Sequence, residues 1–537
     1  MADVDPAAQD DAMAQGDSMA QGHATADADL RADQVSASDD HAWTEDDSEL
    51  PTPSRRSPLT FRGVAMVGAR VVAGTVGIAV AVVTVAAAAL LPLPTITPVA
   101  PSLVVEPVPT AEQLVCPGAI LRLADDIGQG ATTASAIGVP TIRYGSSTGS
   151  VDSARLEQSD ASTGGTAAAP LIISTAPKAA DAEERILLSG AQVQESNEGD
   201  FVGLTAAACV GVSGDTWLAG GSTAVGRTTL LLLSNPTAVP ATVNLELFGE
   251  GGAITAPGTS GIVVAARGQR VLSLAGFAPD VESPVVRVRS VGGQVTAQLQ
   301  QSTVRGLQAG GIDVVSSTLA PSTENVIAGV LVTDSVAVQE LQGGGPGFDD
   351  LRTVLRLFAP GTGQVSATIS VIPEDGVGAG TSFALDFDAG RVTDVPIDEL
   401  EDGSYTVRID SDQPMIASAR VSSALDEVAD FAWASSASPL SATTQLTVAA
   451  GPAPLMHLAN GLDTEAVVIL SSSVGPDSQV QIAAGATATI SLEPGATYVV
   501  RDADRLFISI TFAGDGLVAH YTAQPSGGGS SAVVVYR

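Results

Sequence analysis

The chain contains the same order of short segments and turns three times. The copies begin at Leu230, Val354 and Leu455, and each consists of three pairs of apolar segments with turn residues inside every pair. Segments such as Thr406–Ile409 alternate apolar and polar side chains, which is typical of strands with one face in a core and one in water. About six or seven strands per copy predict an all-β fold of tandem antiparallel β-sandwiches, immunoglobulin- or fibronectin-like in architecture.

These copies divide most of the chain into consecutive units. We expect an irregular β unit at 112–225 and β-sandwich repeats at 226–320, 321–440 and 441–537. The 56 Gly and 31 Pro residues supply the turns that many short strands require. The formal net charge of −35 excludes nucleic-acid binding as the main activity, because such proteins neutralise phosphates with a basic surface.

The irregular unit holds both cysteines of the chain, Cys116 and Cys209. Outside the membrane such a pair is expected to form a disulfide, and two buried free thiols are the alternative. By closing the loop between the two cysteines, the bond would stabilise the folded state by about 4–5 kcal/mol in the chain-entropy model. The last two repeats contain no cysteine and should not depend on the bond directly.

An uncharged run from Val71 to Leu91 precedes the β-rich part. As a helix it would span about 30 Å, the thickness of the hydrocarbon core of a bilayer, so we expect a transmembrane signal anchor at 64–91. No Lys or Arg follows the run until Arg122, whereas four arginines precede it: Arg55, Arg56, Arg62 and Arg70. Basic residues favour the cytoplasmic side. The N-terminus is therefore expected in the cytoplasm and the C-terminal part outside the cell membrane.

The segments that flank this run lack the pattern of a folded core. Residues 1–63 are expected to form a disordered acidic tail, and the Pro-rich residues 92–111 an extended spacer. Two alternatives to a permanent anchor remain open. One is a signal peptide cleaved near Ala86–Ala89, and the other is twin-arginine export directed by Ser54–Leu59. All of them place the bulk of the chain outside the membrane.

A series of motifs in the middle of the chain carries a resemblance to a known family. The motifs are Cys209, Asp215–Trp217, Gly220–Arg227, Leu231–Pro236 and Leu245–Gly252. Together they resemble a family of uncharacterised actinobacterial membrane-anchored extracytoplasmic β-repeat proteins, a domain of unknown function. The likeness runs from about Cys116 to the C-terminus and is strongest over Cys209–Leu274. It implies a location outside the membrane and implies no catalytic residue.

A search for chemically active residues gives few candidates. His457 and His520 lie in the first and last strands of the third repeat, where they could be neighbours in a sandwich and form a two-His or acid–base site. Surface or hydrogen-bonded strand histidines are the simpler interpretation. Acidic pairs such as Glu374-Asp375 and Asp386/Asp388 are expected by chance in turns of so acidic a chain. We therefore predict no catalytic residue, no cofactor and no metal site.

The leading hypothesis is a non-enzymatic, single-pass protein of the cell envelope. It would present a rod of β-sandwich repeats for scaffolding or binding, with an unknown envelope protein or polymer as its partner and no nucleic acid. One alternative is a transmembrane regulator whose acidic tail binds a cytoplasmic protein. A less favoured alternative is a hydrolase of wall polymers that uses His457 or His520.

Overall fold

The computed structural model describes the β-rich part of the chain in detail. The described residues are Val76, Ala79, Val80, 102–105, 112–123, 133–147, 149–162, 166–176, 186–344, 347–377, 380–398, 400–426, 428–440, 443–525 and 533–536. Among them no helix is long and apolar enough to cross a membrane. The expected anchor at 64–91 lies outside them, except for Val76, Ala79 and Val80, which are helical and exposed. The acidic tail with its four arginines also lies outside.

Four units with one strand order make up this part, which confirms the all-β class. In the last unit, whose strands number eight, the first strand pairs with the sixth, the sixth with the third, the eighth with the seventh and the seventh with the second, and the corresponding strands of the other units pair in the same way. We call them units I to IV in chain order. In immunoglobulin domains the first strand lies beside the second, whereas here it lies beside the sixth, so an immunoglobulin-like topology is not shown.

Unit II shows the complete pattern in two sheets. Its first sheet runs β12 (Asp215–Ala219), β18 (Val285–Gly292), β14 (Ala241–Gly249) and β15 (Gly252–Ile254), with β16 (Ile262–Val264) also on β14. Its second sheet runs β20 (Gln308–Val315), β19 (Thr296–Arg305), β13 (Arg227–Asn235) and β17 (Gly268–Ser273). A short 3-10 helix, η2 (Leu274–Gly276), follows β17. Buried and less buried residues alternate along β14, so one face of it enters the core.

Unit III repeats this order with one long strand shared by both sheets. The first sheet runs β21 (Ser322–Val332), β26 (Gly403–Leu425), β23 (Gln364–Pro373) and β24 (Thr381–Asp388). The second runs β27 (Val428–Ser435), β26 again, β22 (Val354–Phe358) and β25 (Thr393–Pro396). Helix α2 (Ser335–Gly343) lies between β21 and β22 and is part of neither sheet.

Unit IV has the same two sheets in a smaller form. The first runs β28 (Thr444–Thr447), β33 (Thr497–Arg501), β30 (Ala466–Ser472) and β31 (Ser478–Ile482). The second runs β35 (Leu517–Thr522), β34 (Leu506–Gly514), β29 (Leu455–Asn460) and β32 (Thr487–Ser491).

Unit I is a fourth copy, although its sequence looked irregular. One sheet runs β2 (Gln113–Cys116), β9 (Leu171–Ser174) and β6 (Asp152–Arg155), and the other runs β11 (Phe201–Ala208), β10 (Leu188–Glu198) and β5 (Thr141–Ser146). Two further strands, β3 (Ile120–Leu123) and β4 (Ala134–Ile137), are inserted between the first and second strands. The counterparts of strands four and five are replaced by β7 (Glu157–Gln158), β8 (Ala161–Ser162) and η1 (Thr166–Ala168). Of these, β7 pairs with β17 of unit II. Separately, β1 (Ser102–Val105) pairs with β36 (Val533–Tyr536).

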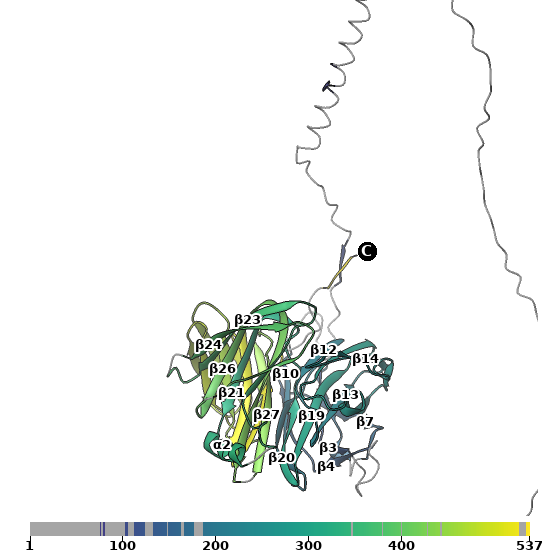
Figure 1. The fold of residues 1–537 in the computed structure, drawn as a ribbon, viewed down its shortest axis with the longest axis vertical. Coiled ribbons are helices and arrows are strands. Elements are labelled where there is room, and N and C mark those ends of the chain that lie inside the picture. The colour runs from purple at the N-terminus through teal and green to yellow at the C-terminus, as the bar shows by residue number, and fades with distance from the viewer. Residues whose placement is uncertain are drawn as a thin grey trace, which may run out of the picture. The chain divides into compact units, whose positions relative to one another are not determined.

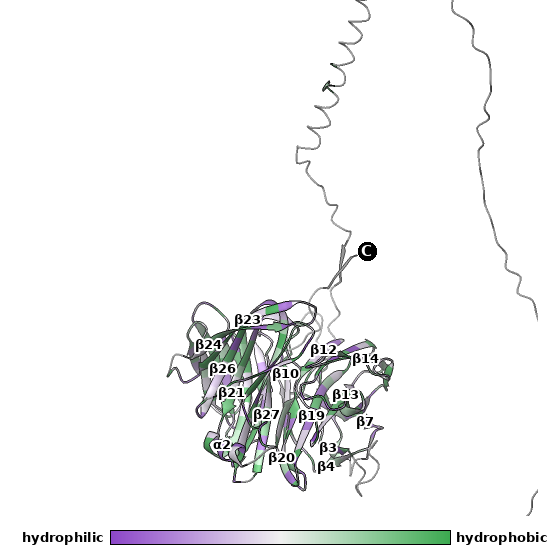
Figure 2. Ribbon diagram, in the orientation of Figure 1, coloured by the Kyte–Doolittle hydropathy of each residue, from purple (hydrophilic) through white to green (hydrophobic). Residues whose placement is uncertain are grey.

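The four units form a closed ring rather than the rod expected from the sequence. The last strands of the units, β11, β20, β27 and β35, pack against one another at the centre, each on at least two others. Figure 1 shows β20 and β27 in the middle, between β23 and β24 of unit III and β13 and β14 of unit II. Residues Ala100–Arg537 form one compact unit. Figure 2 shows hydrophobic and hydrophilic residues mixed along the strands throughout this body.

Each unit packs a sheet on its neighbour through apolar side chains. Units II and III meet at Trp217, Phe248 and Phe358, whose ring centroids lie 4.5–6.2 Å apart. Ala191 and Val193 of unit I lie in one cluster with the core of unit IV. Apolar faces that a separate sandwich would leave in water are therefore buried between units, and this burial favours the ring.

The predicted disulfide between Cys116 and Cys209 is confirmed. It joins the end of the first strand of unit I to the residue after the last strand, among Leu171, Ile173 and Leu188. The bond thus closes unit I upon itself.

Replacing both cysteines by serine is expected to lower the free energy of unfolding by about 2–5 kcal/mol. Unit I should become sensitive to protease first. Because Ala191 and Val193 also belong to the core of unit IV, unit IV should loosen before unit III, so the repeats do not respond independently of the bond. Limited proteolysis followed by mass spectrometry measures the order of cleavage, and an unchanged order would contradict the prediction.

Candidate functional site

One buried carboxylate lies where the four units meet. Asp430 on β27 is 0% exposed and accepts backbone N–H bonds from three other units. The donors are Leu204 on β11 at 3.0 Å, Ile312 on β20 at 3.2 Å and Val518 on β35 at 3.2 Å. A single side chain therefore contacts the last strand of every other unit.

Two glycines allow the backbone to approach this carboxylate. A Cβ atom at Gly203 would lie 2.6 Å from Oδ1 of Asp430, and one at Gly311 would lie 2.9 Å from the same oxygen. Gly311 also has a φ of +104°, which a residue with a side chain rarely adopts. Larger residues at these positions would push β11 and β20 away from β27.

The centre of the ring disfavours the ionised carboxylate. Burial raises the pKa of Asp430 to about 7, although the N–H donors Leu204, Val518 and Ile312 oppose this shift. Burial also raises the pKa of Asp313 on β20 well above its usual range, against the N–H of Trp433 and with a further contribution from Asp430. The two carboxyl groups thus share an apolar, water-excluding environment.

A chain of hydrogen bonds at the boundary of units III and IV contains His457. Its Nδ1 lies 2.5 Å from Oε2 of Glu374 on unit III, and its Nε2 lies 2.8 Å from the hydroxyl of Thr511 on β34. A carboxylate, an imidazole and a hydroxyl in this order resemble the geometry of a nucleophilic triad. The three side chains are nevertheless enclosed, because His457 and Thr511 are 0% and 1% exposed and the Glu374 side chain is 1% exposed.

The carboxylate of Glu374 has four hydrogen-bond partners in total. Its Oε1 accepts from the N–H of Gly329 at 2.9 Å and the hydroxyl of Thr406 at 2.8 Å, both of unit III. Its Oε2 accepts from Thr489 of unit IV at 2.8 Å as well as from His457. Burial raises the pKa of Glu374, but the hydrogen bond from His457 and the other donors outweigh it, so the pKa is lowered. The carboxylate is therefore held ionised and joins two units.

His520, the second histidine of unit IV, also contacts unit III. Its Nε2 lies 3.1 Å from the carbonyl oxygen of Ala328. Burial lowers its pKa to about 4, so the ring is neutral at physiological pH. Residues 511 and 520 are register partners, so β34 lies between the two histidines. The structure places both in one sheet, and each contacts unit III through its own partner.

The boundary of units II and III carries a different polar cluster. The carboxylate of Asp350 accepts from Arg305 at 2.9 and 3.0 Å, from Arg420 at 3.0 Å and from Arg227 at 2.9 Å. Burial would raise the pKa of Asp350, but the arginines hold it well below its usual range. The four residues come from both units and act as an ionic contact between them.

The acidic pairs singled out in the sequence do not gather in one place. Glu374 is buried as described, whereas Asp386 accepts a bond from the Ser366 hydroxyl at an exposed position. Asp402 accepts from the backbone N–H of Ser335. Within the described residues, no group of three or more His, Cys, Asp or Glu side chains could hold a metal ion.

Sequence reasoning missed Asp430 and the partners of His457. The signal for Asp430 is a lone carboxylate inside the apolar stretch Val428–Ala434, since charged residues are rarely fully buried unless they have partners. Glu374 gave no comparable signal, because it precedes Asp375-Gly376 in what looks like an ordinary solvated turn. Its donors come from Gly329, Thr406 and unit IV.

Comparison with known proteins gives a match to a protein family. A family model described as Family of unknown function (DUF5719) matches residues 158–503, which is more than half of the chain. The match begins within unit I and ends in unit IV, and leaves out Cys116. No curated protein matches the chain.

Proposed function

We propose a non-enzymatic role in the cell envelope for this chain, which belongs to the DUF5719 family of unknown function. The expected helix at 64–91 would anchor the protein in the cell membrane with its N-terminus in the cytoplasm. The ring of β units would lie outside the membrane and bind or scaffold an envelope protein or polymer. The actinobacterial, membrane-anchored lineage suggested by the sequence motifs belongs to the same proposal.

The disulfide is the observation that carries the proposed location. Disulfides persist in oxidising compartments and are rare in the cytosol, and Cys116 and Cys209 are paired and buried. The four arginines that precede the uncharged run support the same orientation. Both features favour export of everything after residue 95.

The burial of the polar network supports a binding or scaffolding role. A nucleophile must reach its substrate, whereas the Thr511 hydroxyl is 1% exposed and lies beneath unit III. The Glu374 side chain, which is bonded to both units, is likewise only 1% exposed. These buried groups hold one unit to the next, and a rigid binding surface requires such attachment.

Protease added to intact, wall-stripped cells is expected to degrade the chain after about residue 95. A short fragment that contains the N-terminal tail and the span should remain in the membrane, because the bilayer protects it. Tags at the two termini, followed by immunoblotting, distinguish the fragments. A cytoplasmic protein serves as the control for cell integrity. Protection of the C-terminal tag in intact cells would contradict the proposed topology.

Crosslinking in living cells tests the proposed binding role. The full-length chain should be recovered with an envelope component that becomes attached to residues of the β ring. Attachment confined to the acidic tail 1–63 would instead favour the alternative, a transmembrane regulator with a cytoplasmic partner.

A further inference from the structure

Helix α2 is an addition to the repeated fold. It occupies the connection between the first and second strands of unit III, whereas the corresponding connections of units II and IV contain no helix in the described residues. Val338 of the helix packs with Leu351, Ala424 and Ala429 beneath it. The strand order of the unit does not need this helix, because units II and IV form the same sheets without it.

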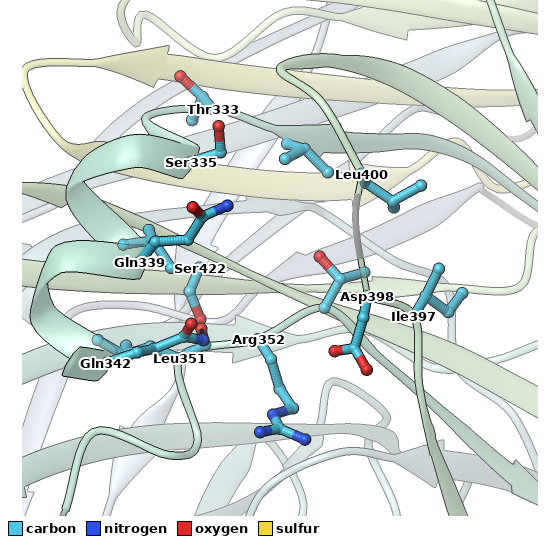
Figure 3. Close-up of a pocket in the computed structure, with 13 residues that line it drawn as sticks. Thr333, Ser335, Gln339, Gln342, Leu351, Arg352, Ile397, Asp398, Leu400 and Ser422 are labelled. Carbon is cyan, nitrogen blue, oxygen red and sulfur yellow. Dashed lines mark hydrogen bonds between the residues drawn. The ribbon is translucent and has the colours of Figure 1, made fainter.

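The helix forms one wall of a small hollow of about 90 Å³. Figure 3 shows Ser335 and Gln339 of α2 on one side and Ile397, Asp398 and Leu400 of the loop after β25 on the other. The hollow thus combines hydroxyl and amide groups with apolar side chains and is closed by two parts of unit III. Its size admits only a small molecule or the end of a larger one.

Two side chains of opposite charge lie at this hollow without partners. Among the residues that the structure describes, neither Arg352 nor Asp398 forms an ion pair. Other arginines of unit III are engaged, as Arg356 is by Asp394 at 2.9 Å. Figure 3 shows the guanidinium and the carboxylate at the lower part of the hollow, on neighbouring segments joined by the bond from the Ile397 N–H to the Thr353 carbonyl at 2.9 Å.

A buried hydroxyl in the wall is also unsatisfied. Ser422 on β26 is 7% exposed and lines the hollow. Its oxygen has no hydrogen-bond partner among the described residues. Because an unpaired buried polar group is destabilising, a ligand atom that pairs with it would gain binding energy.

We propose that this hollow binds a small zwitterion, a free α-amino acid with a short side chain. Its carboxylate would pair with Arg352, whose planar guanidinium matches carboxylate geometry. Its ammonium group would pair with Asp398, and its side chain would contact Ile397 and Leu400. The two unpaired charges are complementary to the two ends of such a molecule. This inference goes beyond the proposed envelope role, because binding by purified protein does not depend on membrane topology.

Isothermal titration of the purified full chain in detergent tests the proposal with L- and D-alanine. We expect a dissociation constant in the range of about 1 μM to 1 mM, the ordinary scale for a ligand of so few atoms. N-acetylalanine lacks the ammonium group and alaninamide lacks the carboxylate, so each should bind at least tenfold more weakly than alanine. Equal binding of alanine and N-acetylalanine, or no binding of alanine, would overturn the proposal.

Paired variants assign the binding to these residues. Arg352→Gln and Asp398→Asn should each weaken alanine binding at least tenfold, with little change in the thermal midpoint because both positions are exposed. Arg289→Gln and Asp477→Asn make the same chemical changes at exposed positions of units II and IV and should leave binding unchanged. Wild-type affinity in both hollow variants would show that alanine binds elsewhere.

Discussion

Replacing Asp430 by alanine is expected to lower the free energy of unfolding by about 3–5 kcal/mol. The change leaves the N–H groups of Leu204, Ile312 and Val518 buried without an acceptor. Each unsatisfied donor costs about 1–3 kcal/mol, and the removal of a buried carboxyl group offsets part of the sum. Denaturant unfolding monitored by circular dichroism measures the loss. Asp463→Ala, at an exposed loop position of unit IV, is the matched control.

The pH dependence separates this role of Asp430 from simple packing. The folded-state pKa is raised to about 7, above the ordinary value, so the folded protein binds the proton more tightly than the unfolded chain. The contribution of Asp430 is therefore fully present below about pH 4 and is lost as pH rises towards 7. Asp430→Asn removes this titration. The difference in stability between wild type and the Asn variant should shift in favour of the variant from pH 4 to 7, and a constant difference would contradict the assignment.

The all-β class follows from local sequence, whereas the ring does not. Alternation in segments such as Thr406–Ile409 depends on neighbouring residues, so it predicts strands directly. The bond from Leu204 to Asp430 joins residues 226 positions apart, and no local pattern indicates such a contact. A row of separate sandwiches was therefore the natural expectation from the repeats alone.

Unit I could not be recognised from the sequence as a copy of the repeat, because part of the repeat is absent from it. The counterparts of the first, second, third, sixth, seventh and eighth strands pair as in the other units. However, β3 and β4 are inserted between the first and second of these strands, and β7 and β8 stand where strands four and five would be. Several of its strands contain only two to four residues, as Glu157–Gln158 does, and so short a segment gives no clear alternation. The disulfide was predictable because it required only two cysteines and the expectation that they lie outside the cytoplasm.

The polar partners of the site were predictable only in part. The sequence placed His457 and His520 in the same unit, and the structure puts them in one sheet. It did not indicate that each would face unit III, because the packing of one sheet on the next is set by the closed ring. Glu374, the partner of His457, lies 83 residues from it in the chain, and Ala328, the partner of His520, lies 192 residues from it.

Replacing Glu374 by alanine is expected to destabilise the contact between units III and IV by about 3–5 kcal/mol. The variant leaves four hydrogen-bond donors without their acceptor; they belong to Gly329, Thr406, His457 and Thr489. Breaking a buried pair by removing one partner typically costs this amount. Since the pKa of Glu374 is lowered on folding, its stabilising effect is present above the ordinary pKa of a glutamate and is lost as pH falls below it.

A double-mutant cycle distinguishes this specific network from a general loss of packing. Glu374→Gln and His457→Gln should each be destabilising, and the double variant should lose less than the sum, because both single changes break the same bond. Asp375→Asn, at the next and exposed residue, is the control. Hydrogen exchange should increase first at the β21 and β29 amides, where the two units meet at Gly329 and His457. Additive effects, with exchange increased equally in units I and II, would mean that Glu374 and His457 act independently and that the boundary is held by apolar packing alone.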